Sequence, residues 1–263
     1  MPIVLDAGQR EELREHCLLQ SATACDPAWS LPAADLLDPD TCRALLDRLG
    51  PVIGSPNRYI TASLLAKRLA FLTTGLALYG MSVMDRGLDL SLANWRLDYR
   101  HQNGLWRSQM PLIDQRASTP ELNTREAWRA SVVQTLFADG LAPLWQSLHQ
   151  STRVPMPVLW ENTAVRVYSL YEKRLTAERH PARQSLIRAD FRWLVEQAPA
   201  AVFGASYNPL QRFFRPRQPD TAKPGARIRK TCCFYYRATE PETYCGTCPL
   251  PHARCKHPKR QTQ

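Results

Sequence analysis

Apolar residues recur every three or four positions over much of the chain, which is the pattern of amphipathic helices. Near the start, Asp6 and Gln9 have the spacing of a capping box and predict a helix that runs to about Gln20. Asp40 precedes a second such run and is placed to cap a helix that ends near Gly50. Both patterns are typical of scaffold helices.

The longest apolar run lies between Thr61 and Met84 and predicts a helix followed by a turn at Asp85-Arg86-Gly87. Its uncharged part, from Leu69 to Met84, has 16 residues. A membrane-spanning helix needs roughly 20 apolar residues. We therefore expect a buried core helix.

Alternation of apolar and polar residues replaces the helical spacing after this turn. The alternation changes phase near Ala93-Asn94, which predicts one strand with a bend, and a second strand is expected at Leu105-Trp106-Arg107. Basic residues interleave with aromatic ones from 95 to 107, and we interpret them as the core and rim of a sheet rather than a ligand surface. The alternating positions are Leu88, Leu90, Leu92, Trp95, Leu97 and Tyr99.

Helical spacing returns in the second half of the chain. A loop over 109–124 has a predicted helix start at Ser118–Glu121, and the helix that follows is expected to break or bend between Gly140 and Pro143. Asn162 is placed to cap a further helix, and another is predicted from Pro181 to about 198. These patterns predict an α+β fold, with a mainly helical body and a small antiparallel sheet.

The chain divides by composition into three parts. Residues 1–214 form the predicted body, residues 215–226 a Pro-rich connector, and residues 227–263 a basic C-terminal segment. From 211 to 263 there are 12 Lys and Arg against 3 Asp and Glu, which is +9 of the total net charge of +10. Most of the functional information is therefore expected in the C-terminal segment.

Five of the eight cysteines lie in the last 32 residues. The chain begins without a basic start and apolar run, so we expect a cytosolic protein without a secretory signal. Clustered cysteines in the cytosol indicate metal or redox chemistry rather than disulfides. No two glycines have Gly-x-Gly spacing, which weighs against a built-in nucleotide site.

The cysteine spacing favours an iron-sulfur cluster over zinc. Cys232 and Cys233 are adjacent, whereas a zinc knuckle separates its cysteines by two to four residues. Eleven residues later comes Cys245-Gly246-Thr247-Cys248, which completes a set of four thiolates. A zinc knuckle and a thiol-only redox pair remain open, and the knuckle would use Cys245, Cys248, His252 and Cys255.

This segment resembles the C-terminal motif of FhuF-type ferric-siderophore reductases, in which Cys-Cys, about ten residues and Cys-x-x-Cys hold one [2Fe-2S] cluster. The resemblance covers about 227–248, including the basic lead-in Arg229-Lys230-Thr231, and extends more loosely to Trp160-Glu161-Asn162-Thr163. It implies a cysteine-ligated cluster segment after the helical body. The implied cluster ligands are Cys232, Cys233, Cys245 and Cys248.

The resemblance implies an enzyme that reduces Fe(III) in ferric siderophores to Fe(II) and so releases iron. Because no nucleotide motif is present, we expect an external electron donor such as a ferredoxin or a reductase. Arg229, Lys230 and Arg237 lie near the ligands in sequence and are candidates for neutralising the cluster or attracting an anionic siderophore. The basic tail is also compatible with peripheral contact at the inner face of the membrane.

Two other interpretations stay open from the sequence. A zinc-stabilised tail could bind nucleic acid through phosphates, although the leading interpretation expects no nucleic acid. An iron-sulfur sensor or scaffold would hold a cluster without turning over ferric chelates.

Overall fold

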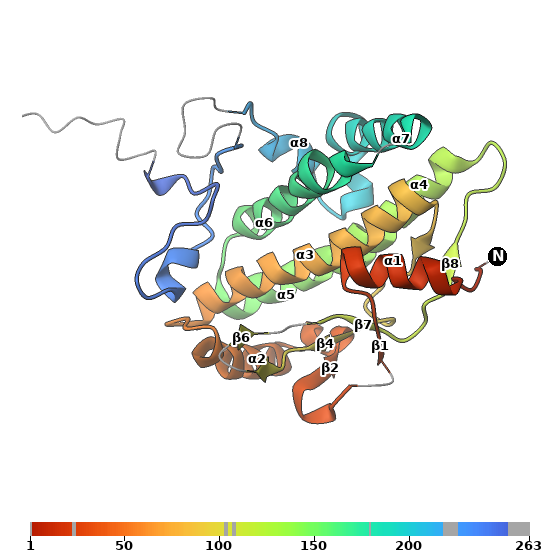
Figure 1. Ribbon diagram of the computed structural model, residues 1–263. Helices are drawn as coiled ribbons and strands as arrows, with labels where there is room; N and C mark the ends of the chain where they lie inside the picture. The colour runs from red at the N-terminus through yellow and green to blue at the C-terminus, as the bar shows by residue number, and fades with distance from the viewer. Residues whose placement is uncertain are drawn as a thin grey trace, which may run out of the picture.

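The computed structural model describes residues 2–22, 25–102, 105–106, 109–178, 180–217 and 226–251. It confirms a mainly helical body with little β structure (Figure 1). The α-helices are α1 (Ala7–Cys17), α2 (Pro39–Val52), α3 (Arg58–Met84), α4 (Arg125–Leu136), α5 (Ala142–Thr152), α6 (Met156–Ser169), α7 (Pro181–Arg192) and α8 (Pro209–Phe213).

Short helical turns of other types connect or extend these helices. Three are π-helical, namely η4 (Phe137–Leu141), η5 (Leu170–Arg174) and η7 (Trp193–Gln197). The 3-10 turns are η2 (Pro27–Trp29), η3 (Ala33–Leu37), η6 (Leu175–Ala177), η8 (Ala200–Phe203) and η9 (Tyr235–Ala238).

Helix α3 runs through the centre of the body, and α1, α2, α4, α5, α6 and α7 pack around it (Figure 1). Its N-terminus is capped by Asn57, whose side chain accepts a hydrogen bond from the amide of Ile60 at 3.1 Å. It is long and apolar enough to span a membrane by length and composition, but 83% of its apolar window is buried inside the protein. The expectation of a core helix agrees with this burial.

The helix starts follow local capping chemistry, which partly differs from the sequence expectation. The capping box of Asp6 and Gln9 is present, but α1 ends at Cys17 because Leu18 has a left-handed backbone with φ of 61°. Asp38, not Asp40, caps α2, since its carboxylate accepts from the amide of Thr41 at 2.8 Å and places Pro39 at the first helical position.

Asn162 does not cap a helix, so that prediction is wrong. Helix α6 begins six residues earlier, at Met156, directly after Pro155. Asn162 lies within α6, fully buried, and its amide hydrogen-bonds to α3. The apolar spacing after 162 is therefore the second half of a longer helix.

The chain does not break near Gly140 and Pro143, because it stays helical from α4 through the π turn η4 into α5, and the irregularity at this point is that π turn. Gly140 suits this close approach, since a Cβ atom would lie 3.0 Å from the carbonyl oxygen of Leu90 and would press against it. Helix α7 begins at Pro181 as predicted and continues through η7 to Gln197.

The strands form four separate two-stranded pairs. One pair is parallel, β1 (Gln20–Ser21) with β7 (Pro111–Leu112). The antiparallel pairs are β2 (Ser30–Pro32) with β4 (Arg96–Asp98), β3 (Gly87–Leu88) with β8 (Ala117–Ser118), and β5 (His101–Gln102) with β6 (Leu105–Trp106).

The predicted single bent strand is in fact β3 and β4, which belong to different pairs. The chain turns between them because the side-chain amide of Asn94 donates to the carbonyl oxygens of Asp89 and Asp114. The predicted helix start at 118–121 is wrong as well, since Ser118 ends β8 and α4 begins at Arg125. Trp95 and Tyr99 are buried, as expected for a sheet core, while Arg107 lies outside the described residues.

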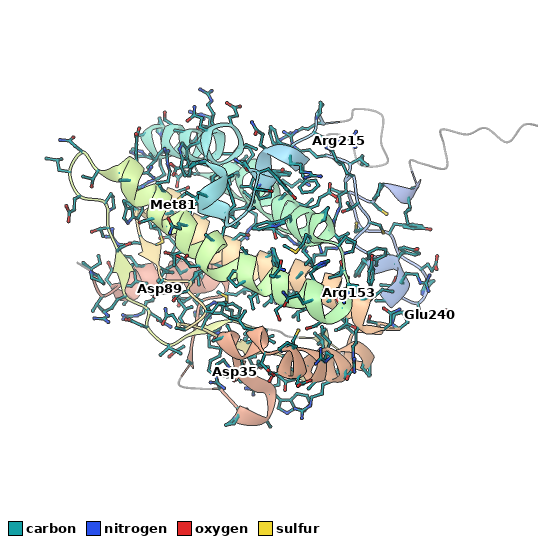
Figure 2. The ribbon with its side chains drawn as sticks, turned by 180° about the vertical axis from the view of Figure 1, so that it is seen from behind. Asp35, Met81, Asp89, Arg153, Arg215 and Glu240 are labelled. Carbon is teal, nitrogen blue, oxygen red and sulfur yellow. The ribbon has the colours of Figure 1, made fainter. Side chains whose placement is uncertain are left out.

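The C-terminal segment packs against the body at the N-terminal end of α3. Figure 2 shows from behind that Glu240 in this segment lies at the opposite end of the molecule from Met81. Phe234 packs its ring against Tyr59 at the start of α3, with ring centroids 5.2 Å apart. This end of α3 is therefore where the cysteines meet the body.

Candidate metal centre

Two short loops carry the four cysteines and bring Cys233 of the first loop against Cys245 of the second. Cys232 and Cys233 precede Phe234, whose backbone has a left-handed φ of 61°, and the amide of Phe234 donates to the sulfur of Cys232 at 3.3 Å. In the second loop, the amide of Cys248 donates to the carbonyl oxygen of Cys245 at 3.0 Å and closes a tight turn. The sulfur atoms of Cys233 and Cys245 lie 3.5 Å apart.

The two loops are also tied to each other and partly shielded from solvent. The amide of Arg229 donates to the carbonyl oxygen of Thr247 at 3.1 Å. Cys233 and Cys248 are buried, with 1% and 4% of their surfaces exposed, while Cys232 and Cys245 are half-buried. Cys233 and Cys248 therefore face the protein interior, and Cys232 and Cys245 lie nearer to solvent.

Glu161 of α6 anchors the first loop. Its carboxylate is 1% exposed and accepts from the amides of Lys230 and Thr231, each at 2.7 Å. The hydroxyl of Thr231 donates to the same carboxylate at 2.5 Å. Charged acceptors strengthen such bonds, so Glu161 fixes the backbone immediately before Cys232.

Ser63 of α3 holds the same loop and is itself held by Asn162 of α6. The hydroxyl of Ser63 donates to the carbonyl oxygen of Cys233 at 3.1 Å. The amide of Asn162 donates to the Ser63 carbonyl oxygen at 2.9 Å and to its hydroxyl at 3.2 Å. Both side chains are fully buried, so this network connects α6, α3 and Cys233 without solvent.

Two cations face the sulfur atoms. Lys67, one turn after Ser63, places its ammonium nitrogen 3.6 Å from the sulfur of Cys233. Arg229 is 2% exposed, and its Nε lies 3.8 Å from the Glu161 carboxylate. The hydrogen bond from Cys245 lowers the pKa of Cys233, and Lys67 and Arg229 lower it further. The same bond raises the pKa of Cys245.

The other predicted basic residues lie elsewhere. The ammonium group of Lys230 donates to the carbonyl oxygen of Arg212 at 3.1 Å, and Arg237 is exposed on η9. Neither lines the cavity beside Cys245, whereas Arg229 does. His252 and Cys255, which the zinc-knuckle interpretation requires, lie outside the described residues.

The sequence reasoning missed Lys67 and Ser63 entirely and gave no role to Glu161. One signal was present, because Ser63 and Lys67 are polar residues one turn apart in a mainly apolar, mostly buried helix. The adjacent Glu161-Asn162 pair inside an apolar helix is a second such signal. Buried polar residues of this kind need partners, which lie on the cysteine loop for Ser63 and Glu161, while Asn162 is paired with Ser63.

The residues around the sulfur atoms fit an anionic two-iron cluster. Four thiolates, two ferric ions and two sulfides carry a net charge of about −2. Lys67 and Arg229 supply matching positive charge, and Nε and Nη2 of Arg229 are buried without a hydrogen-bond partner. Among the described residues, no three His, Cys, Asp or Glu side chains converge on a single metal ion.

Comparison with protein families agrees with this donor set. Residues 63–221 match the model described as ferric iron reductase FhuF-like transporter, and residues 229–250 match the FhuF 2Fe-2S C-terminal domain. No curated protein sequence gives a match. The first match covers more than half of the chain, and the second contains all four cysteines. The chain therefore belongs to the FhuF-like ferric iron reductase family, and its cofactor is a [2Fe-2S] cluster.

Proposed function

We propose that this protein reduces Fe(III) in ferric siderophores to Fe(II) in the cytosol. Its cluster ligands are Cys232, Cys233, Cys245 and Cys248. The observation that carries the proposal is the meeting of the Cys233 and Cys245 sulfur atoms, 3.5 Å apart, beside Lys67 and Arg229. Two thiolates on one tetrahedral metal with bonds near 2.3 Å are about 3.8 Å apart, so this spacing suits shared ligation.

The chemistry of iron release follows from ligand preference. A bound [2Fe-2S] cluster supplies electrons one at a time, which matches the single electron that Fe(III) requires. The oxygen donors of a siderophore hold hard Fe(III) far better than Fe(II), so reduction weakens the chelate. The half-buried Cys245 lines a cavity open to solvent, which gives a chelate access to the cysteine loops.

The electron donor is an external protein, such as a ferredoxin or a reductase. The sequence supports this part of the proposal because it has no Gly-x-Gly nucleotide motif. Consumption of a reduced nicotinamide by the purified protein alone would contradict it. Peripheral contact with the inner membrane face is a separate proposal that rests on the basic tail, and sedimentation with anionic vesicles tests it.

The deciding experiment is anaerobic purification followed by the visible spectrum and the iron, sulfide and zinc contents. We expect a coloured protein with two irons and two sulfides per chain, in line with the cluster type. The Cys245→Ser variant should lose the colour, and Cys42→Ser, which changes a buried cysteine of α2, should keep it. Colourless protein with bound zinc would contradict the proposal.

A kinetic experiment then tests turnover. The cluster is reduced with dithionite, the excess is removed, and a ferric chelate is added while the visible absorbance is followed. Reoxidation with Fe(II) release supports a reductase. A stable reduced cluster that no ferric chelate reoxidises would instead identify a sensor or scaffold.

A further inference from the structure

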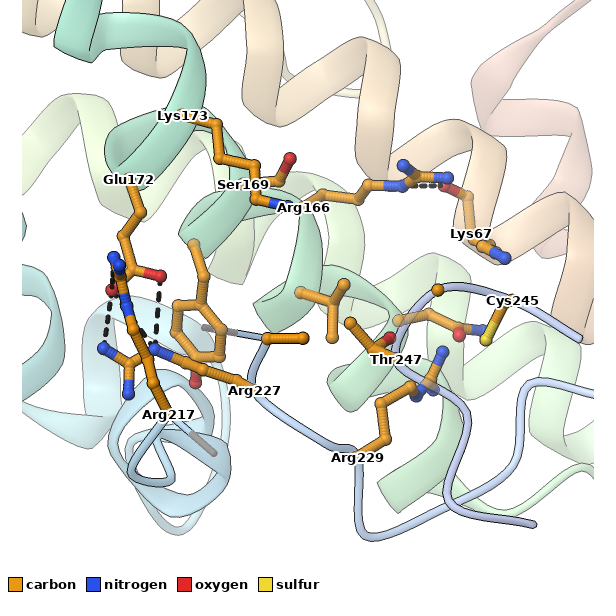
Figure 3. A pocket seen from close by; sticks show the side chains of 15 residues that line it. Lys67, Arg166, Ser169, Glu172, Lys173, Arg217, Arg227, Arg229, Cys245 and Thr247 are labelled. Atoms are coloured by element: carbon orange, nitrogen blue, oxygen red, sulfur yellow. Dashed lines mark hydrogen bonds and ion pairs between the residues drawn. The ribbon is translucent and has the colours of Figure 1, made fainter. Parts of the chain in front are cut away.

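A cavity of about 250 Å³ lies beside Cys245, between α6, η5 and the C-terminal segment (Figure 3). Its lining is strongly basic. Six basic side chains face it and Glu172 is its only acidic residue among the described positions. The six are Lys67, Arg166, Lys173, Arg217, Arg227 and Arg229.

Some of this positive charge is matched within the protein. Arg227 and Arg217 both pair with Glu172, at 2.6 Å and 3.3 Å. Lys67 and Arg229 face the cysteine sulfur atoms, where they balance the thiolates.

The remaining charge is in excess. Arg166 hydrogen-bonds only weakly to a carbonyl oxygen, that of Lys67 at 3.4 Å, and no acidic residue other than Glu172 lines the cavity within the described part of the chain. Lys173 is exposed at the rim. Glu172 is shared by two arginines, so the wall made by Arg166, Lys173 and Arg217 keeps a net positive charge.

The cavity also contains a buried acceptor without a partner. Oδ1 of Asn162 has no hydrogen-bond partner, although this side chain is fully buried. Its amide nitrogen is already committed to Ser63, which fixes the orientation of the oxygen. A buried acceptor favours a donor, which a carboxylate does not bring, so this atom would select a hydroxyl or N–H of a bound group and does not contribute to its charge preference.

We propose that this cavity selects anionic ferric chelates by binding a carboxylate-bearing arm, and that Arg166 and Lys173 determine the charge preference. Guanidinium and ammonium groups bind carboxylate oxygens with charge-assisted hydrogen bonds. A volume of about 250 Å³ suits one arm rather than a whole chelate. The inference deepens the proposed function and rests on it, because Cys245 is treated as a cluster ligand.

Binding without electron transfer provides the test. Gallium(III) forms the same complexes as iron(III) but is not reduced under these conditions, so calorimetry with gallium citrate measures affinity alone. We expect gallium citrate to bind the cluster-loaded protein, and Lys173→Glu to weaken this binding about tenfold. Neutral tris(acetohydroxamato)gallium should show no such difference.

The matched control is Arg188→Glu, which makes the same change of charge at an exposed position of α7 outside the cavity. It should leave gallium citrate binding within twofold of the unmodified protein. Equal weakening by both variants would show a long-range field instead of a site, and no weakening by Lys173→Glu would also overturn the proposal. Free citrate that binds as tightly as gallium citrate would show a general anion site and overturn the claim of chelate selection.

Failure of the inference is distinguishable from failure of the proposed function. Reoxidation of the reduced cluster by ferric citrate and neutral hydroxamate chelates alike, unchanged in Lys173→Glu, contradicts only the charge selection. Gallium citrate binding that depends on Lys173, without reoxidation by ferric citrate, supports the binding site and contradicts the reductase.

Discussion

Helix α3 meets a buried carboxylate from another helix at each of its ends, and the two carboxylates are used differently. Near the C-terminal end, Asp190 of α7 is 0% exposed and is bound by Arg125 at 2.8 Å, Arg129 at 3.2 Å and the Ser82 hydroxyl at 2.9 Å. Near the N-terminal end, Glu161 accepts three hydrogen bonds from the cysteine loop, and its nearest arginine atom is 3.8 Å away.

We interpret the Asp190 end of α3 as a site that stabilises the body and the Glu161 end as a site that binds a group from outside the polypeptide. At the Asp190 end, the arginines lie on helices of the body and bind Asp85 and Asp190 directly, although Nε of Arg129 has no partner. At the Glu161 end, the cations outnumber the acids and Arg229 keeps buried nitrogen atoms without partners. A protein keeps such unmatched charge where a group from outside the polypeptide completes it, which here is the cluster and, by our proposal, an anionic chelate.

The largest expected effect is at the stabilising end. Asp190→Ala leaves the buried Arg129 without its carboxylate and leaves the half-buried Arg125 with Asp85 alone, and breaking a buried pair in this way costs about 3–5 kcal/mol. Denaturant unfolding of the anaerobic protein measures the loss. The reduction potential of the cluster, measured on the folded fraction of this variant, should not change. Asp190 lies beside the C-terminal end of α3, whereas the cysteines lie beside its N-terminal end.

Glu161→Gln tests the other carboxylate and should have a smaller effect on stability. A glutamine has one acceptor oxygen, so its amide group would face one of the three donors that converge on Glu161. We expect docking of the cysteine loop to weaken by about 2 kcal/mol. The readout is the lifetime of the visible absorbance in air, which should shorten markedly.

The control for this variant is Glu126→Gln, an exposed position in the first turn of α4. It should leave the lifetime of the cluster unchanged. A cluster in Glu161→Gln that is as long-lived as in the unmodified protein would show that the loop does not depend on this anchor.

The comparison also shows how far the sequence could predict the fold. The long apolar run predicted α3, and Asp6 with Gln9 predicted the start of α1, because periodicity and capping are local properties. The start of α6 was mispredicted because Asn162 has a good capping side chain, whereas its actual partner, Ser63, is 99 residues away. The pairing of β3 and β4 with different strands depends on Asn94 and Asp114, which are also distant in sequence.

For the candidate site, the sequence predicted the chemistry but not the surroundings. Cysteine spacing is a local signal, so it was enough to predict a [2Fe-2S] cofactor, which the family match supports. Lys67 and Glu161 belong to other helices and join the site only when the C-terminal segment docks on α3 and α6. Arg229 was predicted as a nearby cation, but its burial and its place in the cavity are consequences of that docking.

Lys67→Gln removes a positive charge beside Cys233 and leaves the Glu161 carboxylate that anchors the cysteine loop in place. The ammonium group lies 3.6 Å from the Cys233 sulfur and favours the more negative, reduced state of a cluster there. Its loss should lower the reduction potential by about 40 mV, which corresponds to about 1 kcal/mol for one electron. Potentiometric titration of the visible spectrum measures the shift.

The matched change for Lys67 is Lys230→Gln, because Lys230 is also close in sequence to the ligands but its ammonium group bonds to the Arg212 carbonyl oxygen. Its potential should stay within about 10 mV of the unmodified protein. Equal shifts in the two variants would show that total charge, rather than the contact with Cys233, sets the potential.

The smallest effects should come from two serines of α3, of which Ser63 lies near its N-terminal end and Ser82 near its C-terminal end. Ser63→Ala removes a hydrogen bond to the Cys233 carbonyl oxygen, and Ser82→Ala removes one to Asp190, each worth about 1 kcal/mol. We expect Ser82→Ala to lower the free energy of unfolding and leave the cluster lifetime unchanged. We expect Ser63→Ala to shorten the cluster lifetime and leave the free energy of unfolding unchanged. If both variants changed both quantities together, docking of the cysteine loop and folding of the body would be one cooperative event, and the division between the two ends of α3 would not hold.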